Sequence, residues 1–401
     1  MAQHKCRILF IAESVTLAHV ARPYALASSL DRERYDVSFA CDSKYAALMD
    51  FSGMNKYHLA SISGERFLAA LATGRPAYDT ETLRCYVRDD LNLLKCVAPD
   101  LVVGDFRLSL AVSARLEKIP YANIINSYWS PFAKIRYPIP DHFLVRMVGL
   151  RAAQFIFDAV RPIIFALHTG PFNRLMRENG LGDFGHSLQR VYSQGDYTFY
   201  ADYPGFVEMD QLPNNHVFLG PILWSPTISL PKWWGRIPHD KPIVYVTLGS
   251  SGSTHLLKIV LKALSELPIT VIASTAGEPV SNETYQNAYL AEYLPGDQCI
   301  ALSKLVVCNG GSPTCQQSLA AGVPVIGIAS NLDQHLNMEA VQSKGAGQLL
   351  RAEYASPENI SKLVREMLIS DKYNRAASSF VTLFQEFNGR NAFAQFIMHL
   401  V

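Results

Sequence analysis

The segment formed by residues 305–334 constrains the fold of this chain more than any other part of its sequence. A short apolar run at residues 305–308 is followed by the letters NGGSPT, in which a serine and a proline favour the start of a helix. Gly322 ends that helix, and residues 323–328 form the next apolar run, typical of a buried strand. Two glycines between a strand and a helix let a ligand approach the backbone closely, and the amide groups of a helix start favour an anion. The segment therefore predicts a strand–turn–helix unit of a parallel α/β sheet, with an anion, most simply a diphosphate, at the turn.

The composition of the chain limits the classes of protein to which it can belong. With 401 residues, of which 49% are hydrophobic, it is long enough to bury two cores, so two α/β domains are expected. The 36 basic and 35 acidic residues argue against a nucleic-acid partner, which usually needs a basic excess. The seven cysteines are odd in number and lack the paired spacing of a zinc site, which favours free thiols in a reducing compartment.

The sequence predicts neither export nor membrane insertion. The chain passes from its first residues directly into a strand-like run at 6–12, and it contains no uninterrupted run of 18 apolar residues. The most apolar region, residues 143–167, is interrupted by charged residues. Its Phe143, Phe155 and Phe157 could pack on a neighbouring domain, line an acceptor site or face a membrane. We therefore expect a cytoplasmic protein, with peripheral contact to the inner face of the membrane as an additional option.

Strands and helices alternate in both halves of the chain. The alternation starts at residue 7 and restarts at residue 243, after a stretch rich in proline and tryptophan that cannot form a long helix. Residues 137–180 depart from it, because they are helical and punctuated by prolines. We predict an N-terminal domain at residues 1–222, a linker at 223–241, a second domain at 242–375 and a C-terminal helical segment at 376–401.

Residues 307–317, together with Asp333 and Gln334, resemble the donor-site signature of nucleotide-sugar-dependent glycosyltransferases of the GT-B fold. Within that class the similarity is to the GT1 family, which includes the UDP-glycosyltransferases and the bacterial macrolide glycosyltransferases. The family pattern reads His-x-Gly-x-x-Ser/Thr, then an acidic residue one turn later, Gly-Val-Pro, and Asp/Glu-Gln. The similarity is strongest over residues 242–351 and weaker over residues 6–126. It implies two Rossmann-like α/β domains that face a central cleft, with a C-terminal helix that crosses back to the N-terminal domain.

Two positions depart from the family pattern. Asn309 stands where the family has a diphosphate-binding histidine, and an amide can donate a hydrogen bond but carries no charge. Gln317 stands where the family has a ribose-binding glutamate, so a charge-assisted bond to the ribose is lost. These changes leave the choice between a UDP-sugar and a dTDP-sugar open.

The resemblance implies a donor-binding set built from several turns of the second domain. An ordinary connection between strand and helix would also account for the turn after residues 243–248, and a tyrosine in the predicted base-binding loop could equally be simple packing. The side chains of Asp333 and Gln334, which follow the predicted strand at residues 323–328, would bind hydroxyl groups of the sugar. The full set is Gly249, Ser250, Ser251, Tyr293, Leu294, Asn309, Gly310, Gly311, Ser312, Thr314, Gln317, Asp333 and Gln334.

The resemblance also implies a catalytic pair in the first domain. His19 follows the first strand, at the place where the family has its catalytic base, although the family's preceding glycine is Ala18 here. A dehydrogenase would instead show a GxGxxG turn at this place, which this chain lacks. Asp105 ends another strand, where family members hold a carboxylate against the histidine, and helix capping is the alternative role of this residue.

We therefore expect an inverting glycosyltransferase that moves a sugar from a UDP- or dTDP-sugar to a hydroxyl of a small-molecule or lipid acceptor. No cofactor and no metal are expected, because the sequence has no DxD-like or His/Cys cluster near the motif. The sequence leaves the oligomeric state open. Two alternatives are a GT-B sugar-nucleotide epimerase, which would need carboxylates rather than His19, and a non-catalytic partner of a glycosyltransferase.

Overall fold

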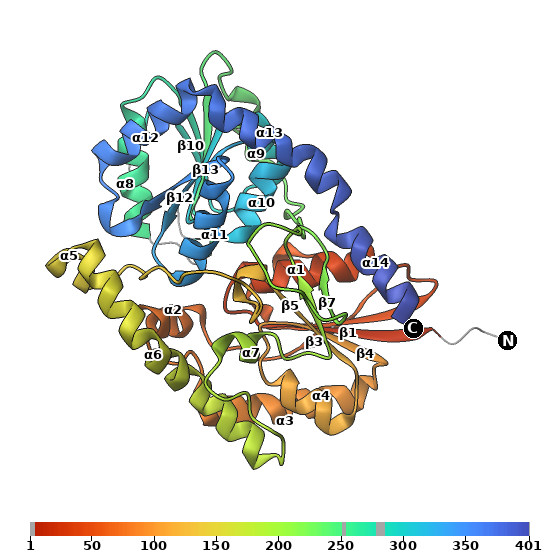
Figure 1. Ribbon diagram of the computed structural model, residues 1–401. Helices are drawn as coiled ribbons and strands as arrows, with labels where there is room; N and C mark the ends of the chain where they lie inside the picture. Colours follow the sequence, from red (N-terminus) through yellow and green to blue (C-terminus); the bar gives the residue numbers. More distant parts are fainter. Residues whose placement is uncertain (1–4, 251–253, 278–284, 401) are drawn as a thin grey trace. The chain divides into compact units, whose positions relative to one another are not determined.

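The computed structural model describes residues 5–250, 254–277 and 285–400, and it divides the chain into two compact units. The first unit comprises the described residues up to Arg136, Phe155–Ile222, and the described residues from Phe387 onward. The second comprises Tyr137–Gln154 and the described residues of Leu223–Glu386. Each unit contains one parallel sheet with helices on both faces, so the expected pair of Rossmann-like α/β domains is confirmed (Figure 1).

The sheet of the first unit has the strand order β3-β2-β1-β4-β5-β6-β7, and all of its pairings are parallel. Most residues of its central strands are buried because helices cover both faces. The strands are β1 (Cys6–Ala12), β2 (Tyr35–Cys41), β3 (Asn55–His58), β4 (Leu101–Asp105), β5 (Tyr121–Ile125), β6 (Tyr197–Tyr200) and β7 (His216–Phe218). The helices and 3-10 turns of this part of the chain are α1 (Leu17–Ser29), η1 (Ser43–Leu48), α2 (Gly64–Ala72), α3 (Thr80–Val97), α4 (Leu110–Glu117), η2 (Ser127–Trp129), α6 (Leu150–Glu178), α7 (Leu188–Tyr192) and α14 (Gly389–Leu400).

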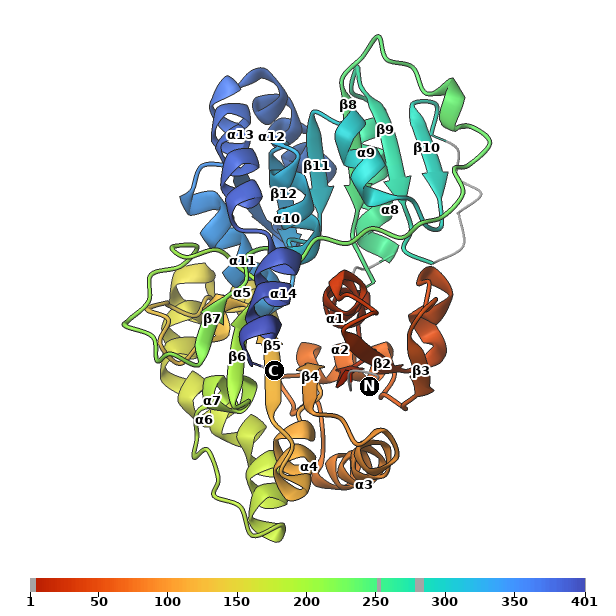
Figure 2. The same ribbon diagram turned by 90° about the vertical axis from the view of Figure 1, so that its right-hand side faces the viewer.

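Side chains that alternate along β1 show how this unit is layered. Phe10 packs edge-on against Phe393 of α14, with ring centroids 5.8 Å apart, and α14 also lies against α1. Leu9 and Ile11 point to the opposite face, where they join a core with residues of α3 and α4. Figure 2 shows α1 and α14 on one side of this sheet and α3 and α4 on the other.

The sheet of the second unit has the order β10-β9-β8-β11-β12-β13 and is also parallel. One face is covered by α8 and α12, which enclose an apolar cluster together with the central strands. The strands are β8 (Ile243–Thr247), β9 (Thr270–Ser274), β10 (Ala288–Ala291), β11 (Leu305–Cys308), β12 (Val325–Ala329) and β13 (Gly347–Arg351). The helices and 3-10 turns are α5 (Phe143–Val148), η3 (Trp234–Arg236), α8 (Thr254–Ser265), α9 (Gly296–Leu302), α10 (Ser312–Ala320), α11 (Leu332–Ser343), η4 (Ala352–Tyr354), α12 (Pro357–Ile369) and α13 (Asp371–Glu386).

The borders of the two units differ from the expected domain borders in three places. Residues 223–241, expected as a linker, belong to the second unit, where the indole N–H of Trp233 donates to the Leu290 carbonyl at 3.1 Å. The expected return segment at 376–401 starts later in the structure, because α13 packs on α10 and stays with the second unit up to Glu386. Residues 137–154 belong to the second unit rather than the first, since Asp141 donates its backbone N–H to the Ser330 carbonyl, at 2.8 Å. The guanidinium of Arg351 also binds the Ile139 carbonyl, at 2.9 Å.

Among the helices of the described residues, none is both long enough and apolar enough to cross a bilayer.

Candidate active site

Both sheets reverse their strand order at one point, and several predicted site residues lie at or just after the ends of the strands at those points. In the first sheet the reversal falls between β1 and β4, and in the second between β8 and β11. At such a point the connections leave in opposite directions, which opens a crevice at the carboxyl ends of the strands where ligands of α/β proteins bind. His19 and Asp105 lie at the first of these points, and Gly249 and Asn309 at the second.

His19 and Asp105 form a hydrogen-bonded pair in the first unit. His19 lies in the first turn of α1, and Asp105 is the last residue of β4, which pairs with β1. Nδ1 of His19 is 2.8 Å from Oδ1 of Asp105. An ionised carboxylate only accepts hydrogen bonds, so Nδ1 carries the proton and the lone pair of the ring lies on Nε2. The carboxylate is fully buried, whereas the imidazole side chain keeps 20% of its surface accessible, as a proton acceptor for an external ligand requires.

Arg22 is a further member of this cluster, and the sequence alone did not identify it. Its Nε and Nη2 atoms each donate to one oxygen of Asp105, both at 2.8 Å, and Nη2 also lies 3.2 Å from Nδ1 of His19. Its Nη1 donates to Oδ1 of Asn126, whose amide donates in turn to Asp202. Arg22 follows His19 by three positions in a predicted helix, and this spacing puts both side chains on one face, which is the signal that could have identified it.

Phe106 packs against the face of the His19 imidazole ring. Its ring is stacked on that of His19, with the centroids 4.7 Å apart and the planes 14° from parallel. The residue has a φ of +58°, a left-handed conformation that is unusual for a bulky side chain and is typical of functional sites. The turn after β4 therefore supplies both the carboxylate and the aromatic contact that orient His19.

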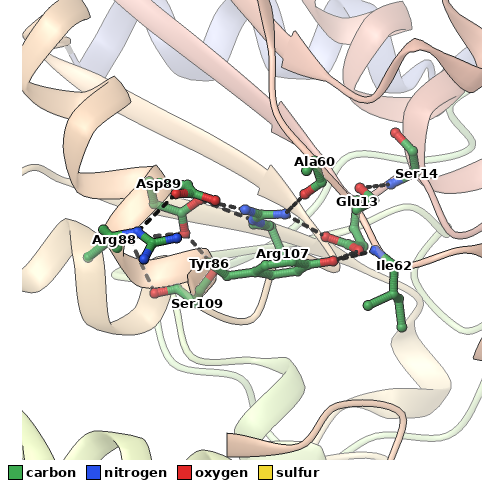
Figure 3. A network of polar contacts seen from close by, with 12 residues as sticks. Glu13, Ser14, Ala60, Ile62, Tyr86, Arg88, Asp89, Arg107 and Ser109 are labelled. Carbon is green, nitrogen blue, oxygen red and sulfur yellow. Dashed lines mark hydrogen bonds and ion pairs between the residues drawn. The ribbon is translucent and has the colours of Figure 1, made fainter. Parts of the chain in front are cut away.

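A buried network of ion pairs and hydrogen bonds stabilises the turn after β4 (Figure 3). Arg107 is buried and binds Glu13 through Nη1 at 3.0 Å and Asp90 through Nη2 at 3.0 Å. Its guanidinium lies over the ring of Tyr86, 3.5 Å from the centroid, and the Tyr86 hydroxyl donates to Glu13 at 2.8 Å. Burial raises the pKa of Glu13, and the adjacent positive charge of Arg107 acts against that shift. Both carboxylate oxygens of Glu13 are therefore engaged in this network, which connects the end of β1 to Arg107, the residue after Phe106.

The predicted glycine turn of the second unit lies between β11 and α10. Gly310 has a φ of +81°, and a Cβ atom there would lie 2.6 Å from Cγ of Met338, so only glycine fits. Gly311 is the N-cap of α10 and contributes no side-chain acceptor to the first turn of the helix. The amide of Gly310 donates to Sγ of Cys308 at 3.3 Å, and that of Gly311 to Oδ1 of Asn309 at 3.1 Å, so both are engaged within the turn in this structure. Ser312 is buried and Thr314 is half-buried in the same helix turn.

Asn309 brings the two central turns of this unit together. It follows β11, whose last residue pairs with Thr247 of β8, and it is buried. Gly249 follows β8 with a φ of +64°, and a Cβ atom there would lie only 3.3 Å from Nδ2 of Asn309. The amide side chain thus lies directly beside the turn that contains Gly249 and the half-buried Ser250. Ser251, which was predicted to belong to this turn, lies outside the described residues.

Gln317 and Tyr293 contact neighbouring turns of the second unit. Nε2 of Gln317 donates to the carbonyl of Trp224, and its Oε1 lies next to Gly296. Gly277 has a φ of +96°, and the Tyr293 hydroxyl lies so close to it that a Cβ there would clash. The next residue, Leu294, is buried, so its side chain belongs to the core and only its backbone could contact a base.

Asp333 and Gln334 start α11, directly after β12. Gln334 forms a capping box with Asn331: its amide N–H donates to Oδ1 of Asn331 at 3.0 Å, and its Oε1 accepts from the Asn331 amide at 3.3 Å. Oε1 also accepts from the Ser330 amide at 2.9 Å, so this oxygen stabilises the helix start. Asp333 is half-buried in the first turn, at the positive end of the helix dipole.

Within the described residues, no group of three His, Cys, Asp or Glu side chains lies close enough to hold a metal ion.

Comparisons with known proteins agree with this architecture. Residues 243–389 match the model of the Glycosyltransferase family 28 C-terminal domain. The chain is 50% identical to a PGL/p-HBAD biosynthesis rhamnosyltransferase of Mycobacterium bovis, over 96% of this chain and 85% of that protein. An inactive PGL/p-HBAD biosynthesis glycosyltransferase of the same species is 49% identical over 64% of this chain and 70% of its own length. The structure of spinosyn rhamnosyltransferase SpnG complexed with thymidine diphosphate matches with a TM-score of 0.69 at 15% identity, over 98% of this chain and 99% of that one.

The two parallel sheets, their strand-end sites and these matches define a glycosyltransferase of the GT-B fold, as the sequence resemblance implied. The sequence identity of 50% over 96% of the chain also assigns it to a narrower family. This protein belongs to the family of the mycobacterial PGL/p-HBAD biosynthesis glycosyltransferases.

Proposed function

We propose that this glycosyltransferase transfers a sugar from a nucleoside-diphosphate donor to an acceptor hydroxyl, with inversion at the anomeric carbon and with His19 as the general base. The observation that carries the proposal is the position of the buried Asp105 carboxylate, 2.8 Å from Nδ1 of His19. This pairing leaves Nε2 of the accessible ring with a free lone pair that can accept a proton. The same pairing supports a base role in other enzymes, where the carboxylate fixes the tautomer and stabilises the protonated ring.

The proposed step is a single displacement. Nε2 of His19 takes the hydroxyl proton while the acceptor oxygen forms a bond to the anomeric carbon of the sugar. The bond from that carbon to the diphosphate oxygen breaks on the opposite face, so the configuration inverts and the nucleoside diphosphate leaves with the electron pair. The developing imidazolium then lies next to Asp105, whose negative charge stabilises it.

The second unit is proposed to hold the donor at its own strand-reversal point. Glycine turns at the starts of helices are suited to binding a diphosphate. The turns that contain Gly249 and Gly310 lie next to each other, because the side chain of Asn309, which precedes Gly310, lies beside Gly249. The Gly310 and Gly311 amides are engaged in this structure, so binding through them requires the Asn309 side chain to release Gly311. We propose Asp333 as the partner of a sugar hydroxyl, since it lies at the same edge of the sheet.

The names of the relatives narrow the substrates that we propose. A rhamnosyltransferase is among the most similar proteins, and the structurally matching rhamnosyltransferase was obtained with thymidine diphosphate. We therefore propose a dTDP-rhamnose donor in preference to a UDP-sugar. For the acceptor we propose a hydroxyl compound of the biosynthesis named for the relatives, small or lipophilic in character. The seven cysteines are all free, which supports a reducing compartment such as the cytoplasm as the place of action.

The test combines binding and transfer. Purified protein is screened for thermal shifts with dTDP-rhamnose, UDP-glucose and GDP-mannose, since a ligand of the native state raises the melting temperature. Transfer to a phenolic acceptor is then followed with and without EDTA, and the anomeric configuration of the product is read by NMR. A shift with dTDP-rhamnose alone, an inverted product and an EDTA-insensitive rate are expected. A retained configuration would refute the mechanism.

A non-catalytic role is the second candidate, because one relative is described as inactive. The hydrogen-bonded His19–Asp105 pair argues against that role here. Turnover by the purified chain alone excludes it, whereas donor binding without any transfer or donor hydrolysis would favour it. Formation of an epimeric sugar nucleotide in the same assay would instead indicate the epimerase alternative.

A further inference from the structure

Two separate series of contacts connect the imidazole of His19 to one short segment of the first unit, the residues that follow β5. Figure 2 shows β5 between β4 and β6, so the segment after it adjoins the ends of both neighbouring strands. The segment comprises residues 126–129, of which all but the half-buried Trp129 are buried. We refer to these four residues as the β5 turn.

The first series is polar and passes from Asp105 through Arg22. Nη1 of Arg22 donates to Oδ1 of Asn126 at 2.8 Å, while its Nε and Nη2 atoms bind Asp105. Nδ2 of Asn126 donates to Oδ1 of Asp202 at 3.1 Å, and the other oxygen of Asp202 accepts from the backbone N–H of Ser127. Asn126 and Asp202 keep only 6% and 1% of their surface accessible, so water cannot readily replace these bonds. The series therefore fixes the guanidinium that holds the carboxylate of Asp105.

The second series is aromatic and reaches the same turn from the face of the imidazole. Phe106, which is stacked on His19, contacts the ring of Tyr192 with the centroids 5.5 Å apart. Tyr192 in turn packs edge-on against Trp129, with the centroids 5.1 Å apart and the planes at 84°. The carbonyl of Tyr192 also accepts from the side-chain amide of Asn123 in β5, at 2.9 Å. Edge-to-face packing favours one mutual orientation of the rings, so Phe106 is held against the imidazole.

The two series restrain different motions of the same ring. The polar series fixes the carboxylate of Asp105 and with it the direction of the Nδ1–H bond, whereas the aromatic series limits tilting of the imidazole plane. A general base must keep its lone pair directed at the acceptor hydroxyl, and small displacements cost much of the rate. We propose that Asn126 and Trp129 are positioning residues that hold His19 in its productive orientation. This inference rests on the proposed role of His19 as the base.

The polar series is tested by one variant that breaks it and by another that rebuilds it. Asn126→Leu has a similar volume but removes both side-chain hydrogen bonds. In Asn126→Asp/Asp202→Asn the amide and the carboxylate exchange places. The carboxylate at position 126 then accepts from Arg22 and from the amide at position 202, whose oxygen accepts from Ser127. Each of these bonds is restored with the same net charge.

Turnover of dTDP-rhamnose with para-nitrophenol provides the first readout. Asn126→Leu should lower kcat by about 10–10²-fold, because the lone pair of His19 is no longer held in place. The KM for the donor should stay constant, since the change lies in the first unit and affects the chemical step. The exchange variant should recover most of the lost kcat.

The tautomer of His19 provides a second readout that needs no turnover. NMR of protein with isotope-labelled histidine, at about pH 8.5 where imidazoles are neutral, distinguishes the Nδ1–H form from the Nε2–H form, and His19→Ala assigns the signals. The unchanged protein and the exchange variant should show the Nδ1–H form alone, and Asn126→Leu a mixture of both. Trp129→Ala should give a second set of His19 signals and a lower kcat, which Trp129→Phe should largely restore because a ring again faces Tyr192.

Two matched controls separate positioning from a general loss of stability. Asn173→Leu makes the same change at an asparagine that is also 6% accessible, whose side chain binds the backbone of residues 184 and 185. Trp234→Ala removes a half-buried indole of the second unit. Both variants should retain the Nδ1–H form of His19 even where their melting temperatures fall.

The outcomes distinguish this inference from the proposed function. An unmixed Nδ1–H form with normal kcat in both Asn126→Leu and Trp129→Ala would overturn the positioning roles, as would a mixture of tautomers in Asn173→Leu. If Asn126→Leu does not fold, the exchange variant and Trp129→Ala decide, because an Nε2–H form in the exchange variant would also overturn the polar part. Tautomers that change as expected in proteins that all lack turnover would support positioning and refute the proposed reaction.

Discussion

Arg22 forms a bidentate ion pair with Asp105, in which each carboxylate oxygen accepts one hydrogen bond of 2.8 Å from the guanidinium. Asp105 is therefore shared between a permanent cation and the imidazole of His19. Arg22 thereby fixes the position of the carboxylate that orients the imidazole ring.

The first prediction concerns His19 and Asp105, the proposed catalytic pair. His19→Ala should lower kcat by about 10²–10⁴-fold, the usual contribution of a general base. Asp105→Asn should cause a loss of comparable size, because the amide no longer fixes the tautomer that leaves Nε2 free. Donor binding, measured by thermal shift, should stay unchanged for His19→Ala. Full activity of this variant would show that another group accepts the proton.

The second prediction separates the charge of Arg22 from its hydrogen-bond geometry. Arg22→Gln leaves a buried carboxylate without its cation and should destabilise the first unit by about 3–5 kcal/mol. Turnover should fall as well, because Arg22 holds the carboxylate that orients His19. Arg22→Lys keeps the charge but not the bidentate geometry, so its loss of stability should be smaller. The exposed Arg75→Gln is the control, and equal turnover and melting temperature for all four proteins would contradict a role of Arg22 in positioning Asp105.

The third prediction concerns the glycine turn. Gly310→Ala places a Cβ against Met338 at a left-handed φ, and should destabilise the second unit by about 1–3 kcal/mol and weaken donor binding. Gly310→Ala/Met338→Ala removes the clash but not the backbone strain, so donor affinity should recover only in part. Gly235→Ala, which has no neighbour within 4 Å of the added atom, should behave as the unchanged protein. Thermal shifts with the donor measure all three.

The fourth prediction follows from a buried histidine in α11. Burial, together with the nearby charge of Arg351, lowers the pKa of His335 to about 3. The unfolded chain protonates this ring below its ordinary pKa of about 6.5, while the folded protein does not. The free energy of unfolding should therefore decrease as the pH falls from about 6.5 toward 3, by up to about 1.4 kcal/mol per pH unit.

Urea unfolding of the unchanged protein and of His335→Met at several pH values measures this contribution. The variant should show a shallower loss of stability on acidification, because it cannot take up the proton on unfolding. His239→Gln alters an exposed ring and serves as the control. Equal slopes for His335→Met and the unchanged protein would mean that the ring gains its proton in the folded state as well.

The sequence predicts the strands that alternate with helices, since long apolar runs between turn residues specify buried parallel strands. It misses β3 and β10, which are short edge strands without a fully buried residue. The turn at Gly310 was also predictable, because two adjacent glycines between a strand and a helix are typical of a tight turn with a left-handed residue. These two strands carry too little apolar pattern to be recognised in this way.

The site was predictable only where a residue type and a strand end coincide. His19 and Asp105 meet because their strands are neighbours in the sheet, a fact that the resemblance supplied and composition alone did not. Arg22 and Gln334 show the limit of such reasoning. The partner of Arg22 lies 83 positions away in the sequence, and Gln334 caps its own helix through a local bond. Long-range partners and competing local hydrogen bonds are both decided by the folded geometry.

Asn309 gives the second unit an uncharged amide beside Gly249, where the resemblance to the GT1 pattern led us to expect a histidine. An amide gains no charge in mild acid, so this contact with the donor should be equally strong on both sides of neutrality. Saturation by the proposed nucleotide sugar should then be almost the same in mild acid as at neutral pH.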